Sequence, residues 1–329
     1  MRKSVILINM GLVAFVSLLI APMVGMAFIP INELWQAPGS TDAGILRDIR
    51  IPRVLTAFTV GGALALSGMT FQAMFRNPLA TPFTLGTASG ASLGAAIYIR
   101  LGLTFSLLGI SGIIFAAFAG SLLAVVFVYG LTRLKSGFSS ATLLLAGVAV
   151  SFFFSSLILF IQYISGFTNS FRILRWMMGS VDLMGYDGLL NMLPLILIGL
   201  LIVLFSSNEL NLLMTGDDIA ASRGVNVNRT KKVLFTATSL MVGGVVAFCG
   251  PIGFIGMIAP HISRLLIGSN HRILIPATIL FGGTFLLICD TLARTLIAPV
   301  EIPVGVLTAL IGGPFFIVLL LNRKGGLGL

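Results

Sequence analysis

Ionisable residues that lie inside apolar parts of the sequence are the first candidates for chemistry. Asp290 and Arg294 are the clearest pair, and their spacing of four places both on one face of a helix. A carboxylate in such surroundings can relay protons, or it can form a structural ion pair. We favour the structural pair, because an ion-coupled protein would need more such carboxylates than this sequence offers.

Motifs for other chemistries are missing from the sequence. It has no GxxxxGK[ST] loop to cradle phosphates, so this chain is not expected to hydrolyse ATP itself. His261 and His271 lack clustered ligands, and Cys249 and Cys289 fit no metal or redox spacing. No nucleophile and base pair stands out. We therefore expect no enzymatic activity, no metal site and no bound cofactor.

Arginines gather in two further places. Arg47, Arg50 and Arg53 lie in RDIRIPR, and Arg172 and Arg175 form a second group. Guanidinium groups pair with carboxylates in two-pronged fashion, which suits docking of an acidic partner. Anchoring to lipid headgroups is the alternative, and the residues themselves leave both open.

These residues must be positioned by membrane-spanning helices. The chain of 329 residues is 57% apolar and 9% charged, and its mean hydropathy is +1.09. Its apolar runs approach or exceed the roughly 20 residues that cross a bilayer as a helix. We predict an all-α polytopic membrane protein of ten spans, and residues 1–329 form a single transmembrane domain. The spans are expected near 5–28, 54–74, 83–100, 105–130, 140–164, 189–206, 233–249, 252–267, 273–297 and 303–321.

The positions of the basic residues predict the orientation. All five lysines, Lys3, Lys135, Lys231, Lys232 and Lys324, fall on the same side of the predicted membrane as the N-terminus. By the positive-inside rule that side is the cytoplasm, so both termini are expected there, in the cell (inner) membrane. The net charge of +10 is thereby explained without nucleic-acid binding.

The longest cytoplasmic connection, at about 206–232, contains the charged stretch GDDIAASRGVNVNRTKK. Asp217 and Asp218 suit the positive N-terminal end of a short helix, and Gly224 can close it with a left-handed cap. Small residues dominate between them. We expect a short helix that lies close in a groove of another protein.

Two segments match at an offset of 182 residues, GGALALSG at 61–68 and GGVVAFCG at 243–250, with Pro78 and Pro260 also aligned. The two spans run in opposite directions, so this is an inverted repeat of the kind found in transporters. RNPLATP at 76–82 and CGPIGFIGMIAPH at 249–261 interrupt helices at membrane depth, which favours a pathway between the spans.

The chain resembles the FecCD family along nearly its whole length. The resemblance is carried by RIPRVLTAFTVGGALALSGMTFQAMFRNPLATPFTLGTASGASLGA, GDDIAASRGV, GPIGFIGMIAPHISRLLIGSNHR and EIPVGVLTALIGGPFFIVLLL. Members are permease subunits of type II ATP-binding cassette importers for ferric siderophores, haem and cobalamin. The resemblance implies that permease fold and a core of two permease chains, identical or related. It also implies two cytoplasmic ATPase subunits, which use ATP and Mg²⁺, and an extracytoplasmic substrate-binding protein.

Site residues follow from the same resemblance. GDDIAASRGV would form the contact with the ATPase, through Asp217, Asp218, Ala220, Ala221, Ser222, Arg223 and Gly224. Arg50, Arg53 and Arg294 match arginines that grip the binding protein. Asn77, Leu79, Ser140 and Ala141 match the cytoplasmic gate. The expected function is import of an iron chelate, with a ferric siderophore as the first candidate. Haem and cobalamin are the alternatives, and an ion-coupled secondary transporter is the alternative from another class.

Overall fold

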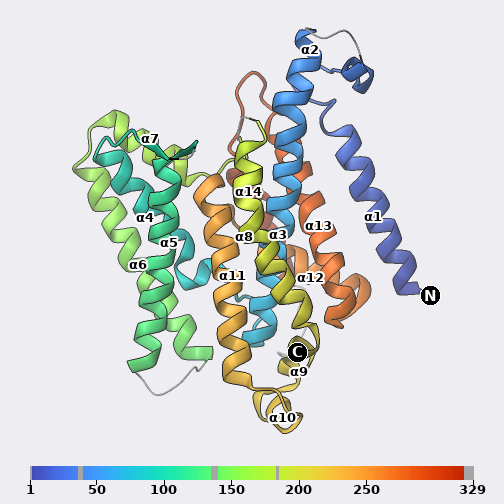
Figure 1. The fold of residues 1–329 in the computed structure, drawn as a ribbon, viewed down its shortest axis with the longest axis vertical. Coiled ribbons are helices and arrows are strands. Elements are labelled where there is room, and N and C mark those ends of the chain that lie inside the picture. Colours follow the sequence, from blue (N-terminus) through green and yellow to red (C-terminus); the bar gives the residue numbers. More distant parts are fainter. Residues whose placement is uncertain (1, 36–39, 108, 135–139, 183–184, 322–329) are drawn as a thin grey trace.

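The computed structural model describes residues 2–35, 40–107, 109–134, 140–182 and 185–321, and it is built of helices (Figure 1). The first part of the chain contains α1 (Arg2–Ile20), η1 (Ile31–Trp35), α2 (Thr41–Gly44), the π-helical turn η2 (Ile45–Arg50), α3 (Ile51–Phe75), η3 (Pro82–Leu85) and α4 (Thr87–Arg100). A hairpin of β1 (Ser106–Leu107) and β2 (Ile110–Ser111) leads to α5 (Gly112–Leu134), α6 (Ser140–Tyr163) and α7 (Phe167–Met177). The remainder contains α8 (Asp187–Phe205), α9 (Ser207–Thr215), α10 (Asp217–Ser222), α11 (Val227–Cys249), α12 (Ile255–Ile267), α13 (His271–Ala293) and α14 (Val304–Leu321).

Each of the ten predicted spans corresponds to a helix. In the described part of the chain, seven helices are long and apolar enough to cross a membrane, and Ile255–Ile267 and Val304–Leu319 are shorter apolar helices. The remaining predicted span coincides with α4, which has 14 residues. The polytopic helical fold class is thereby confirmed.

Several predicted boundaries were wrong, because apolar sequence continues past the ends of the helices. The span near 105–130 begins only at Gly112, since residues 106–111 form the hairpin. The span near 5–28 ends at Ile20, and the span near 273–297 ends at Ala293. Hydropathy registers burial in lipid or protein, and it does not register where a backbone turns.

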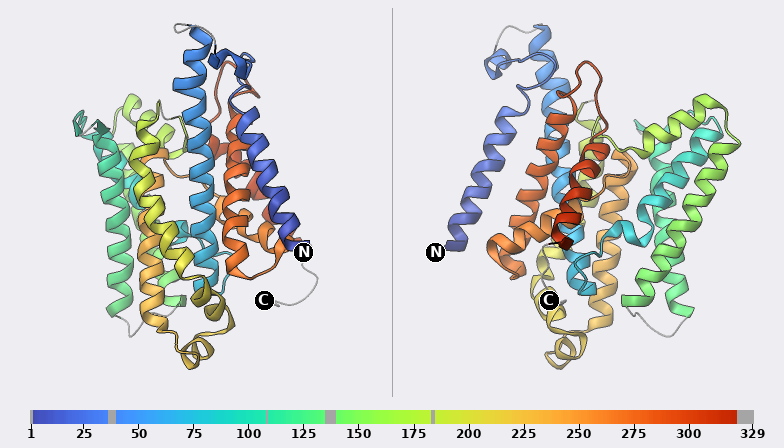
Figure 2. Two further views of the ribbon diagram at one scale, coloured as in Figure 1. Left: turned by 45° about the vertical axis from the view of Figure 1, so that its right-hand side comes forward. Right: turned by 180° about the vertical axis from the view of Figure 1, so that it is seen from behind.

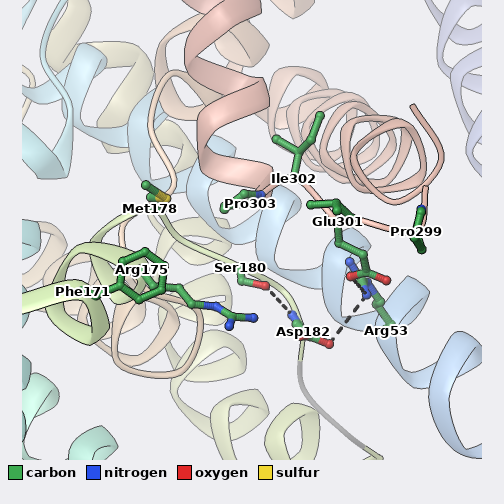
Figure 3. Close-up of a pocket in the computed structure, with 11 residues that line it drawn as sticks. Arg53, Phe171, Arg175, Met178, Ser180, Asp182, Pro299, Glu301, Ile302 and Pro303 are labelled. Atoms are coloured by element: carbon green, nitrogen blue, oxygen red, sulfur yellow. Dashed lines mark hydrogen bonds and ion pairs between the residues drawn. The ribbon is translucent and has the colours of Figure 1, made fainter. Parts of the chain in front are cut away.

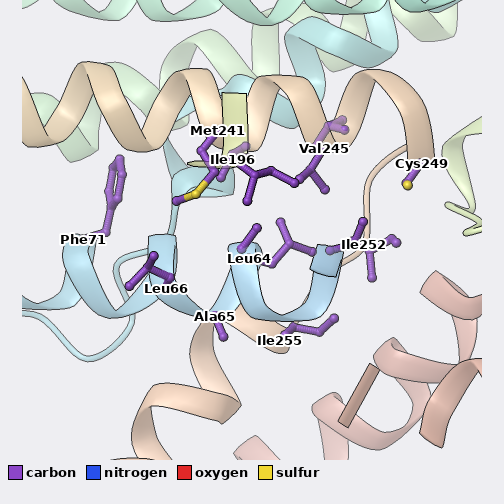
Figure 4. Close-up of a cluster of buried hydrophobic side chains, with 14 of the residues drawn as sticks. Leu64, Ala65, Leu66, Phe71, Ile196, Met241, Val245, Cys249, Ile252 and Ile255 are labelled. Carbon is purple, nitrogen blue, oxygen red and sulfur yellow. The ribbon is translucent and has the colours of Figure 1, made fainter. Parts of the chain in front are cut away.

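The helices form a central group with a flank on either side. Figure 2 shows α1 on one flank and α4, α5 and α6 on the other, with α3, α11, α12 and α13 between them. The core is one cluster of buried aliphatic and aromatic side chains that extends through most of the helices. Figure 4 shows the part of it that α3, α8, α11 and α12 contribute. A Cβ added to Gly68 of α3 would overlap the backbone carbonyl of Gly256 in α12, so these helices need glycine at that contact.

The inverted arrangement is visible in the two matched helices. Helices α3 and α11 run in opposite directions (Figure 1). A non-helical break follows each of them, with Arg76 (φ 49°) after α3 and Phe254 (φ 68°) before α12. The second break is shorter than predicted, because Pro260 lies inside α12.

Candidate functional site

Helix α10, at one end of the molecule, is the short helix that the charged stretch predicted (Figure 1). Asp217 and Asp218 occupy its first turn, where carboxylates complement the positive end of the helix. The Gly224 N–H donates to the Ala221 carbonyl at 2.9 Å, and the Val225 N–H donates to the Ala220 carbonyl at 3.1 Å. These two bonds with Gly224 at φ 87° form a Schellman cap.

The predicted contact residues of α10 do not all face outward. The Ala220 side chain is fully buried against the rest of the chain. Asp217 accepts a 2.6 Å hydrogen bond from Lys231 Nζ of α11, and Lys231 is only 2% exposed. The outward surface is formed by Asp218, Ile219, Ala221, Ser222, Arg223 and Gly224. Ala220 and Asp217 therefore fix the position of the helix, while the others are available to a partner.

The predicted gate residues lie near the same end. Asn77 follows the end of α3, and its Oδ1 accepts the Leu79 N–H at 2.9 Å, which holds a tight turn. The Leu79 side chain is 48% exposed. Ser140 and Ala141 begin α6, and their side chains lie outside the described part of the structure.

A buried ionic cluster occupies the end of the molecule opposite α10. Arg53 Nε donates to both carboxylate oxygens of Asp290 at 3.1 Å, and Nη2 donates to Oδ1 at 3.0 Å. Arg53 also donates to Glu301 at 2.8 Å and lies 3.6 Å from Asp182. The Asp290 side chain is fully buried. Arg53 thus joins α3 to α13 and to two loops.

Arg294 is the secondary partner of Asp290. Its Nε lies 3.8 Å from Asp290 Oδ2, while its Nη2 donates to the Ala21 carbonyl at 2.7 Å. The prediction of a structural ion pair at Asp290 fits this geometry, but sequence spacing missed Arg53 as the main partner. Arg53 and Asp290 are separated by 237 positions, and no local pattern could have joined them.

The three arginines predicted to dock a binding protein all make hydrogen bonds to groups of their own chain. Arg50 donates to the carbonyls of Pro22, Met23 and Ala27, at 2.8 to 3.2 Å. Arg50, Arg53 and Arg294 are each less than a tenth exposed. Their guanidinium groups hold together the ends of α1, α3 and α13 that lie far from α10.

A cavity of about 550 Å³ opens beside the ionic cluster (Figure 3). Its walls include Arg53, Asp182 and Glu301 on one side and Phe171 and Arg175 of α7 on the other. Sequence reading missed α7, although the spacing of Phe167, Phe171 and Leu174 is that of an amphipathic helix. Across the described residues, no group of three or more His, Cys, Asp or Glu side chains is placed to hold a metal.

Curated relatives match this chain over most of their length. The chain is 40% identical to the hemin transport system permease HmuU of Yersinia pestis, over 91% of this chain and 90% of the relative. It is 39% identical to the cobalamin import permease BtuC of Halobacterium salinarum, with coverage of 85% and 74%. The molybdate import permease MolB of Haemophilus influenzae is 38% identical, with coverage of 86% and 82%.

The fold is also similar to that of a solved structure described as an inward-facing conformation of a metal-chelate type ABC transporter. The TM-score is 0.86 at 33% identity, and the match covers 96% of this chain and 99% of the other. Residues 12–322 match the FecCD transport family. The chain therefore belongs to the FecCD transport family of ABC importer permeases.

Proposed function

We propose that this chain is the permease subunit of an ATP-driven importer that moves an iron chelate, with a ferric siderophore as first candidate, into the cytoplasm. The match over residues 12–322 carries the proposal, and the likeness to a metal-chelate transporter supports the substrate class. Haem and cobalamin are the alternatives, because relatives of 39% and 40% identity are named for them. None of the three relatives above is named for a siderophore, so the substrate must be decided by experiment.

Transport is driven by two ATPase subunits that hydrolyse ATP with Mg²⁺. The outward surface of α10, around Ile219 and Arg223, supports this, since Ile219 is 48% exposed and a large apolar side chain on a charged loop suits a protein contact. Arg223 and Gly224 close the helix at that surface. Closure of the ATPases would push on α10 as a rigid body.

The permease works as a pair, with an identical or related chain, in the cell (inner) membrane. Helix α1 starts and α14 ends toward the end that α10 occupies (Figure 2), which supports placing both termini with α10 in the cytoplasm. The outer cavity then faces the extracytoplasmic binding protein.

Docking of that binding protein by Arg50, Arg53 and Arg294 stays a prediction. Because these guanidinium groups are already paired internally, carboxylates of the partner would have to displace the chain's own groups. Glu301 and Asp182 are the displaceable ones on Arg53, since their side chains are 47% and 56% exposed. The gate role of Asn77, Leu79, Ser140 and Ala141 is likewise a prediction.

An ion-coupled secondary transporter is disfavoured by the same cluster. Asp290, the carboxylate that such a mechanism would use, is fully buried and bonded to Arg53 through both oxygens. Both carboxylate oxygens already accept hydrogen bonds from the Arg53 guanidinium, which is the geometry of a structural ion pair.

The test is reconstitution of this chain in liposomes with its co-purifying ATPase and binding protein. Ferric siderophores, haem, cobalamin and molybdate are offered in turn, and uptake and ATP hydrolysis are measured together. We expect one iron chelate to stimulate both. Uptake of molybdate or cobalamin alone would overturn the iron assignment, and uptake by the isolated chain along an ion gradient would overturn the ATP-driven mechanism.

A further inference from the structure

Polar side chains join α9, which precedes α10, to the first residues of α13. Asn211 Oδ1 accepts the backbone N–H of His271 at 2.9 Å and lies 2.9 Å from the ring Nδ1 of the same residue. Asn211 also donates to Asn270 at 3.4 Å. Arg272 Nε donates to Asn208 Oδ1 at 3.0 Å. Two asparagines of α9 therefore hold the start of α13 through four contacts.

The two contacts between Asn211 and His271 are partly buried, whereas the contacts to Asn270 and Arg272 are exposed. The His271 side chain is 2% exposed, and Leu210 and Leu213 of α9 are fully buried. The His271 ring is shielded from water, so its Nδ1 depends on Asn211 Oδ1 as a partner inside the chain. Any displacement of α9 must therefore carry the start of α13 with it or break these bonds.

Helix α13 reaches from this joint to the outer cavity. Its 23 residues correspond to about 35 Å at 1.5 Å per residue. Its outer end carries Asp290, which binds Arg53. There the Ile302 N–H also donates to the Ala293 carbonyl at 3.0 Å, and Ile302 lines the cavity. One continuous helix, which contains Pro276 in its second turn, thus contacts the α9–α10 segment at one end and the cavity wall at the other.

We propose that Asn211 is a positioning residue that transmits displacement of the α9–α10 segment to α13, and through α13 to the outer cavity. This inference rests on the proposed function, because it takes the ATPase to push on α10. The new element is the contact between α9 and the start of α13, through which a displacement of α10 would reach the transmembrane helices. Two sites about 35 Å apart can be coupled in this way when a rigid element links them.

The test compares Asn211→Ala with Asn228→Ala in the reconstituted complex. Asn228 is an exposed asparagine at the same end of the molecule, in the first turn of α11, and serves as the matched control. Asn211→Asp is the rescue variant, since it keeps the oxygen that accepts the His271 N–H. ATPase association, basal ATP hydrolysis and uptake per ATP hydrolysed are measured for each.

Asn211→Ala should keep ATPase association and basal hydrolysis but lower uptake per ATP about fivefold, the scale set by one hydrogen bond of about 1 kcal/mol. Asn228→Ala and Asn211→Asp should behave like the wild type. Spin labels at Leu174 and Val300, both exposed at the outer end, should report an ATP-dependent distance change that Asn211→Ala loses. A merely structural role would not separate hydrolysis from transport.

An unchanged ratio of uptake to ATP in Asn211→Ala overturns the inference. If Asn211→Ala does not fold, Asn208→Ala, which breaks the exposed contact to Arg272, takes its place, and a normal ratio there overturns it equally. Wild-type liposomes that show no ATP-dependent uptake would instead contradict the proposed function. The two failures are therefore distinguishable.

Discussion

Replacing Asp290 with asparagine tests whether the outer ionic cluster is structural. Asparagine keeps the size of the side chain but removes its charge, which leaves Arg53 and Arg294 without their buried partner. Loss of one member of a buried ion pair typically costs about 3–5 kcal/mol. Glu301 remains 2.8 Å from Arg53, so we expect the lower end, about 3 kcal/mol of destabilisation.

The assay is denaturant unfolding of the purified chain in detergent, with the midpoint and slope compared between variants. Glu301→Gln is the control, because the Glu301 side chain is 47% exposed and exposed pairs contribute about 1 kcal/mol or less. A midpoint of Asp290→Asn close to that of the wild type would refute the structural reading. If that variant also folded normally but lost a proton-dependent activity, Asp290 would be a relay and the ATP-driven mechanism would be in doubt.

Three further substitutions probe the packing and the two ends of the molecule. Gly68→Ala should destabilise the chain by about 1–3 kcal/mol, because the added Cβ would overlap the Gly256 carbonyl. In the control Gly44→Ala the added Cβ has no neighbouring atom within 4 Å, so thermal unfolding should be unchanged. Gly224→Val should strain the left-handed cap by about 1–2 kcal/mol and lower the unfolding midpoint accordingly. We also expect reduced co-purification of the ATPase, and unimpaired assembly would contradict the coupling assignment. Arg50→Met removes the donor to three carbonyls near the end of α1, so residues 21–29 should exchange amide hydrogens faster while α11 stays protected.

Much of the fold could be predicted because its signals are local. Long apolar runs predicted the helices, and Asp217, Asp218 and Gly224 predicted α10 with its cap. Each of these follows from the chemistry of neighbouring residues, namely burial of apolar side chains in lipid and the charge and backbone preferences of helix ends.

The predicted site was less complete, because a residue's role depends on which way its side chain points. Ala220 belongs to the α10 motif but is buried, whereas Ala221 beside it is exposed. The arginine cluster that includes Arg50 and Arg53 was interpreted as a docking surface, but the structure shows that both side chains are buried. The sequence does not show whether an arginine is exposed to a partner protein or already hydrogen-bonded within its own chain.

Patterns within short stretches of the chain were enough to identify a polytopic helical membrane protein of the FecCD family with an exposed short helix at one end. Only the tertiary structure decided that Arg53 holds Asp290 across 237 positions and that Asn211 holds the start of α13. Hydropathy and capping act over a few residues, whereas these contacts form only after the helices have packed. The physical reason is that the partner of a buried polar group is chosen by the packing of whole helices, which no short stretch of sequence encodes.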